Sequence, residues 1–420
     1  MAPEAKAEAE AEHELLETTL DDLKHLFSPR AEAGDTVVLN MGPQHPSTHG
    51  VLRLIIELDG EIIINAVPDI GFLHTGIEKN MEAKTFVKAL VMTDRIDYLN
   101  NMGNNLVYCL AVEKLMDVKV PPRAQVIRVL LAELQRIASH LVWLGTHSAD
   151  IASQSVLFYC FREREKILAI YEMISGQRLM TSYMRPGGLW RDVPAGFEDA
   201  VRDFINYLPA RLDEYEALLS RNPIWLDRTK DIGLIDGPNA LAWGLTGPSL
   251  RGSGVNFDIR KAMPYSGYEQ YEFEVPLGQN GDVYDRYWVR MQEFRQSLKI
   301  IDQALRKLPK GPVMTDNRKV APPPRSELGH SMEAVIHHFK LWTEGFNAPK
   351  GEVYVPVESP RGELGVFLVG NGGPKPQRVH FRTPSFINLQ ALPVMSKNHY
   401  VADAVGIVGS IDIVLGDVDR

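Results

Sequence analysis

The residues best suited to chemistry lie in one short loop, residues 42–50, with the sequence GPQHPSTHG. The loop carries two imidazoles, His45 and His49, beside the hydroxyl of Thr48, and imidazole is the side chain that exchanges a proton near neutral pH. Two prolines inside the loop and a glycine at each end disfavour a regular helix or strand. The loop is therefore a candidate for hydrogen bonding and proton transfer, and the alternative is a turn whose histidines bond the backbone.

The sequence after the loop predicts the support that holds it. Apolar residues alternate on both sides of an Asp59-Gly60 pair, which suits a type I′ turn: Leu52, Leu54, Ile56 and Leu58 before it, and Ile62, Ile64 and Ala66 after it. This pattern predicts a β-hairpin directly after the loop. A polar loop beside a rigid sheet is a common place for a functional site.

Helical periodicity dominates the middle of the chain. Apolar residues recurring at three and four positions predict helices at about 75–90, 98–116, 122–145, 152–174, 196–219, 285–308 and 330–343. Glycine and proline mark connections at 184–188 and 247–268, and strands are expected again at 353–357, 366–369 and 379–382. The predicted fold class is α+β, with a central bundle of long helices. The predicted regions are an acidic arm (1–34), a β-hairpin region with the loop (35–70), the bundle (71–345) and a C-terminal β region and tail (346–420).

Composition excludes several classes of protein. The net charge of −9 over 420 residues argues against a nucleic-acid partner. Two cysteines, Cys109 and Cys160, are too few for a disulfide framework or an iron–sulfur cluster, and they are expected to be buried. No apolar run is long enough to span a bilayer, so a soluble chain that meets a membrane only through partners is expected. His45 and His49 have helical zinc-ligand spacing, but the prolines oppose a helix there, and no metal site is predicted.

Three residues outside the loop are weaker candidates when each is taken alone. Tyr98 can donate a hydrogen bond or a proton, but a tyrosine near a helix start more often packs in the core. Asp150 can orient an imidazole, although capping of the next helix is the favoured interpretation. Arg361 can reach a ligand or a partner, but its glycine- and proline-rich surroundings favour a surface turn.

Four separated segments, together with RIDY at 95–98, resemble one known family. The four are the loop at 42–50, GFLHTGIE at 71–78, ESPRGELG at 358–365 and GDVDR at 416–420. In this order they resemble the D subunit of respiratory complex I, the NADH:quinone oxidoreductase, over about residues 36–420. The resemblance implies a fold like that of the large subunit of nickel–iron hydrogenases. The two hydrogenase segments that supply thiolates would align with 95–100 and the C-terminus, where no cysteine stands, so a quinone cavity is expected in place of the metal.

The resemblance also implies roles for single residues. His49 and Tyr98 would hydrogen-bond the two quinone oxygens, with His45 and Thr48 completing the quinone contacts. Asp150 would pair with His49 and raise the pKa of its imidazole. Arg95 would lie beside an iron–sulfur cluster that a partner subunit holds.

The function implied is that of the quinone-site subunit of a proton-translocating enzyme. Quinone is the substrate, no cofactor is bound covalently, electrons come from the partner's iron–sulfur cluster, and NADH is oxidised on other subunits. The expected partners are iron–sulfur subunits of the peripheral arm and membrane-arm subunits at the quinone tunnel entrance. They would hold the chain on the cytoplasmic side of a bacterial cell membrane. Two alternatives stay open: a scaffold that bridges the two arms, and the same subunit in a ferredoxin-driven complex.

Overall fold

The computed structural model describes residues 35–45, 48–151 and 153–420. The expected acidic arm at 1–34 lies outside the described residues, as do Pro46 and Ser47 of the loop. The described helices and small sheets make an α+β protein, as the sequence predicts.

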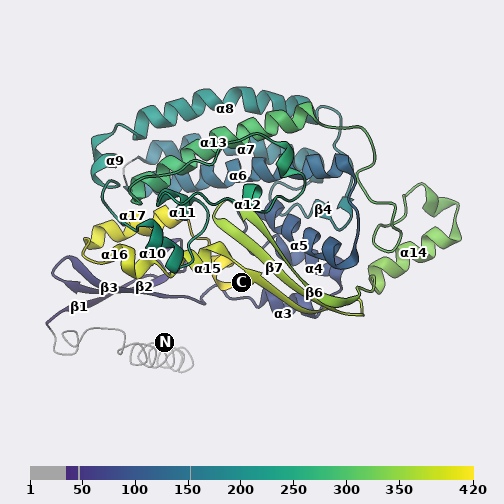
Figure 1. Cartoon of the computed structure of the whole chain (residues 1–420), viewed down its shortest axis with the longest axis horizontal. Helices are drawn as coiled ribbons and strands as arrows, with labels where there is room; N and C mark the ends of the chain where they lie inside the picture. Colours follow the sequence, from purple (N-terminus) through teal and green to yellow (C-terminus); the bar gives the residue numbers. More distant parts are fainter. Residues whose placement is uncertain (1–34, 46–47, 152) are drawn as a thin grey trace, which may run out of the picture.

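Four long helices form the body of the molecule and lie side by side (Figure 1). They are α6 (Pro122–Ile151), α7 (Gln154–Ser175), α8 (Phe197–Leu219) and α13 (Val283–Arg306). Helix α6 begins at a proline, whose missing N–H costs little in the first turn, and its apolar positions are buried as their spacing predicts. It continues six residues past the predicted end at 145 and therefore includes Asp150.

Two three-stranded antiparallel sheets flank this body. The first contains β1 (Val37–Met41), β2 (Arg53–Asp59) and β3 (Ile62–Asp69), and the pairing of Asp59 with Ile62 confirms the predicted hairpin. The second contains β6 (Lys350–Ser359), β7 (Gly362–Asn371) and β8 (Pro376–Arg382), which confirms the three strands expected there. A two-stranded pair, β4 (Met184–Arg185) and β5 (Gly188–Leu189), occupies the connection predicted at 184–188.

The shorter elements complete the chain. The elements before the bundle in the sequence are α3 (Ile77–Glu82), α4 (Phe86–Thr93) and α5 (Asn101–Met116). The short helices between α8 and the second sheet are α9 (Pro223–Asp227), α10 (Gly237–Ala242), α11 (Pro248–Gly252), α12 (Ile259–Ala262) and α14 (Met332–Thr343). The second sheet is followed by α15 (Pro384–Leu389), α16 (Leu392–Ser396), α17 (Val401–Ile411) and α18 (Leu415–Asp419). The single helix predicted at 75–90 is wrong, because Thr85 is extended and starts α4 as a separate helix. The four helices of the tail were not predicted. They are short, so periodicity gives little signal for them.

The C-terminal helices bring the end of the chain to the first sheet and to α6. Helix α16 contacts β3, α17 contacts α6, and one apolar cluster joins the first sheet to this tail (Figure 1). The loop at 42–50 joins β1 to β2, and so it lies at the border of this cluster. None of the described helices is long and apolar enough to cross a membrane.

A network of buried ion pairs also fixes α6. Glu133 pairs with Arg136 on the same helix, and with Arg260 of α12 at 3.1 Å. His140, on the same helix, contacts Glu293 of α13 at 2.8 Å. These contacts hold α6 in one register against its neighbours.

The central position of α6 gives a stability prediction. Leu141 is fully buried, so Leu141→Ala is expected to lower the free energy of unfolding by about 2–5 kcal/mol through lost burial and a cavity. Leu218→Ala on α8 is the matched control, because Leu218 is 42% exposed. Denaturant unfolding followed by circular dichroism measures both, and equal effects of the two substitutions would contradict the assigned core.

Candidate functional site

The loop at 42–50 is held by hydrogen bonds among its own residues. A Cβ at Gly42 would lie 2.1 Å from the carbonyl oxygen of Leu52, so only glycine fits there. The Thr48 hydroxyl is buried and donates to the carbonyl oxygen of His45 at 2.9 Å. His49 has a φ of 54°, in the left-handed region, and keeps part of its surface exposed. Thr48 therefore shapes the loop from inside, and His49 stands at its end.

Tyr98 lies in the connection between α4 and α5, against the C-terminal segment. A Cβ at Gly416 would lie 2.5 Å from the carbonyl oxygen of Ile96 and 3.3 Å from Cε1 of the Tyr98 ring. The ring is partly buried, and the tyrosine precedes α5 and does not stand within it. The close approach of a glycine backbone thus forms one wall beside Tyr98.

Arg361 connects the segments around these two residues. It stands in the turn between β6 and β7 and is fully buried, so the predicted surface turn is wrong. Its guanidinium donates to the Asp97 carboxylate at 2.8 Å and to the Ser139 hydroxyl of α6 at 3.0 Å. It also donates to Asp412 beyond α17, at 2.9 Å to the carbonyl and 3.3 Å to the carboxylate. Glycine and proline beside Arg361 suggested exposure, and no local signal marked these partners, which are far away in the sequence.

The charge of Arg361 acts on both predicted hydrogen-bond donors. Burial, and then the positive charge of Arg361, lower the pKa of His49 to about 4. Burial and the neighbouring Asp97 raise the pKa of Tyr98, while Arg361 opposes that rise. His49 and Tyr98 therefore both lie within the electrostatic reach of one buried cation, although they come from different parts of the chain.

Asp150 does not cap the helix that follows α6. It lies inside α6, and Ser153 is the N-cap residue of α7, so the capping interpretation is wrong. Burial raises the pKa of Asp150, and the charge of His45 opposes the rise. The expectation that Asp150 raises the pKa of His49 is also wrong, because burial and Arg361 both disfavour the imidazolium.

His147 is a neighbour of the site that residue types alone did not mark. It lies one turn before Asp150 on α6, stacked 5.4 Å from the ring of Trp143. Its pKa falls to about 3 because of burial, then Arg290 and Arg286, and then His49. The charge of His49 thus acts on His147, which places the C-terminal part of α6 within electrostatic reach of the loop.

The remaining predicted residues are simple to place. Arg95 is exposed and donates to the carbonyl oxygen of Val91 at 2.8 Å. Cys109 and Cys160 are buried free thiols, as expected, and burial raises the pKa of both. Among the described residues no group of three or more histidines, cysteines or carboxylates is placed to hold a metal ion.

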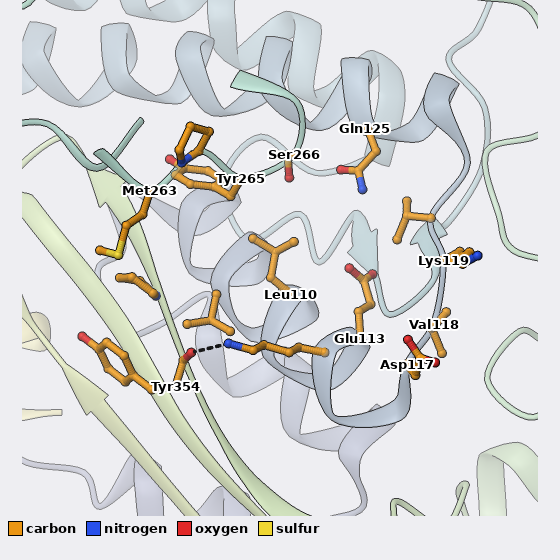
Figure 2. Close-up of a pocket in the computed structure, with 15 residues that line it drawn as sticks. Leu110, Glu113, Asp117, Val118, Lys119, Gln125, Met263, Tyr265, Ser266 and Tyr354 are labelled. Carbon is orange, nitrogen blue, oxygen red and sulfur yellow. Dashed lines mark hydrogen bonds between the residues drawn. The ribbon is translucent and has the colours of Figure 1, made fainter. Parts of the chain in front are cut away.

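A pocket lies elsewhere on the molecule (Figure 2). Its volume is about 740 Å³, and it is lined by the end of α5, the following residues up to 125, residues 263–266 and strand β6. Lys114 bridges it by donating to the carbonyl oxygen of Tyr354 at 3.2 Å. None of the predicted site residues lines this pocket, so its size does not make it the candidate site.

The family match and the similar relatives all point to one family of proteins. Residues 150–420 match the family described as the 49 kDa subunit of the respiratory-chain NADH dehydrogenase. The chain is similar to the D 2 subunit of the NADH-quinone oxidoreductase of Chloroflexus aurantiacus, with 62% identity over 389 residues, covering 92% of this chain and 95% of that relative. The D subunit of the Citrifermentans bemidjiense enzyme is 54% identical over 388 residues, covering 92% of this chain and 100% of that relative.

The lowered pKa of His49 predicts how stability depends on pH. Between pH 6.5 and about pH 4 the unfolded chain binds a proton at His49 that the folded chain does not, so lowering the pH destabilises the fold. His49→Gln should remove this contribution, and the variant should lose less free energy of unfolding than the native chain across that window. Denaturant titrations at both ends of the window measure the difference.

His330→Gln is the control, because His330 is exposed in a turn. It should lose as much stability as the native chain on acidification. An unchanged pH dependence in His49→Gln would contradict an imidazole held neutral by the fold.

Proposed function

Because the chain belongs to the family of the D subunit of NADH-quinone oxidoreductase, respiratory complex I, we propose that it forms the site where that enzyme reduces quinone. The chain is a subunit of this proton-translocating oxidoreductase. The observation that carries the proposal is that the charge of Arg361 lowers the pKa of His49 and limits the rise in the pKa of Tyr98. A quinone headgroup has a carbonyl oxygen at each end and needs one donor on either side, and two partly exposed donors from separate segments fit that need.

The two donors act differently in this proposal. His49, whose pKa of about 4 keeps it neutral at pH 7, binds one carbonyl through a ring N–H and does not act as an imidazolium acid. Tyr98, whose pKa is raised, gives its proton only to a strongly basic oxygen. A quinone oxygen becomes that basic only after reduction, so proton transfer from Tyr98 follows the electrons.

Arg361 contributes a fixed positive charge close to both donors. Reduction adds negative charge to the quinone, and a preorganised cation in a buried region stabilises developing negative charge without reorganising water. Arg361 is held by Asp97, Ser139 and Asp412, so its position does not depend on the ligand. It is a positioning and electrostatic residue of the proposed site.

The other predicted residues have supporting roles in the proposal. Thr48 holds the loop, and the charge of His45 acts on Asp150. Exposed Arg95 faces the partner's iron–sulfur cluster in this proposal. That cluster supplies the electrons. The fold of the nickel–iron hydrogenase large subunit, without its thiolates, is proposed as the origin of the cavity.

Assembly is proposed to follow from the same family. Iron–sulfur subunits would contact the Arg95 side, and membrane-arm subunits would open a tunnel for the lipid-soluble quinone. These partners would hold the chain at the cytoplasmic face of the cell membrane. The scaffold alternative has the same partners but gives His49 and Tyr98 no part in the chemistry.

Substitution in the assembled complex separates the two proposals. Tyr98→Phe and His49→Ala should each lower quinone reductase activity by roughly 10²-fold or more, the scale of a lost general acid or donor. NADH oxidation with a soluble artificial acceptor should stay at the native level, because electron entry is on other subunits. Tyr400→Phe, at a residue 59% exposed, is the control and should change neither activity. Full quinone reductase activity in both site variants would favour the scaffold.

A further inference from the structure

Three buried carboxylates gather around Arg361, behind the proposed quinone site. Asp97 precedes Tyr98, Asp412 follows α17, and Asp417 lies in α18; none is more than 3% exposed. Arg361 forms ion pairs with Asp97 and Asp412 but not with Asp417. The proposed quinone chemistry so far gives none of these carboxylates a part in proton transfer.

Asp97 and Asp417 differ in the hydrogen bonds that their carboxylate oxygens accept. Both oxygens of Asp97 accept hydrogen bonds, one from the Leu99 backbone at 3.1 Å and one from Arg361. Asp417 has no ion pair with any residue in the described part of the chain, and its Oδ2 accepts from the Ser385 backbone at 3.0 Å. Its Oδ1 is buried without a hydrogen-bond partner among those residues. Such bonding suits a carboxylate at Asp97 and a protonated acid at Asp417.

The charges around Asp97, Asp412 and Asp417 also favour a protonated acid at Asp417. Two guanidinium groups face the three carboxylates: Arg361, and Arg290 of α13, which interacts with Asp412. The other titratable neighbours, Tyr98 and His49, are neutral at pH 7. An uncompensated buried charge is costly, so one of the three carboxyl groups should keep a proton. Burial and then the charge of Asp97 raise the pKa of Asp417 to about 7.

We propose that Asp417 and Asp97 share one resident proton, which lies on Asp417 at rest and restores Tyr98 after it has protonated the reduced quinone. This inference rests on the proposed function. Asp97 lies between the other two groups in electrostatic terms, because its charge acts on both Tyr98 and Asp417. The backbone of Gly416, next to Asp417, packs against the Tyr98 ring and brings the two segments together. Asp417 and Asp97 are therefore positioning residues that act through Tyr98.

The step moves a proton and no electrons. The O–H bond of Asp417 breaks, the Asp97 carboxylate passes the proton on, and an O–H bond forms again on the Tyr98 phenolate. Asp417 then takes a proton from water. A phenolate is a far stronger base than a carboxylate, so the transfer runs downhill.

The resident proton is tested first in the resting, assembled complex. A protonated carboxylic acid gives an infrared C=O stretching band that shifts in D₂O, and Asp417→Asn should remove one such band from the native spectrum. Asp403→Asn is the matched control, a buried aspartate of α17 outside the cluster, and should leave the band unchanged. Asp417→Glu should keep a carboxylic acid band. A native spectrum identical to that of Asp417→Asn would overturn the proposal, whatever the outcome for quinone reduction.

The reloading role is tested by the pH profile of quinone reduction. Asp417→Asn should turn over several-fold more slowly at neutral pH and recover as the pH is lowered, while the KM for quinone stays unchanged. Asp417→Glu should restore the native profile. A raised KM with an unchanged pH profile would assign Asp417 a structural role and overturn the relay. If Tyr98→Phe keeps full activity, the proposed function fails instead, and the infrared result for the resting proton still stands by itself.

Discussion

One buried cation determines the arrangement of the proposed site. Arg361 donates hydrogen bonds to three segments that are distant in the sequence: the connection before α5, helix α6 and the chain after α17. Removing one partner of such a buried pair typically costs about 3–5 kcal/mol, because it leaves a charge without compensation. The same guanidinium binds Asp97, the residue before Tyr98, and its charge acts on both Tyr98 and His49. The fold and the proposed chemistry therefore depend on one side chain.

A neutral His49 changes where protons come from. An imidazole held neutral by burial and by Arg361 supplies a hydrogen bond, so it has no spare proton for the reduced quinone. Tyr98 then becomes the direct acid and must recover its proton between turnovers. The buried carboxylates around Arg361 meet this requirement in a region whose charges already favour keeping one proton. Proton supply and site geometry therefore have the same physical origin.

The elements that were predicted correctly are those with a clear pattern in the local sequence. The hairpin after the loop, the long helices and the strands of the second sheet follow from apolar periodicity and turn residues. The glycine and proline beside Arg361 favoured a surface turn, and no local signal marked its ion-pair partner Asp97, which is 264 residues away. The environment of Asp150 and the lowered pKa of His49 also depend on contacts between distant segments. Periodicity carries no information on such contacts, and the short helices of the tail lack a periodic signal altogether.

The most direct test of the account is a structure of the assembled complex with a quinone analogue bound. The account predicts one headgroup oxygen within hydrogen-bond distance of the His49 ring and the other within hydrogen-bond distance of the Tyr98 hydroxyl, with Arg361 still bound to Asp97. A headgroup bound away from these two side chains, or His49 and Tyr98 opening into separate cavities, would contradict it.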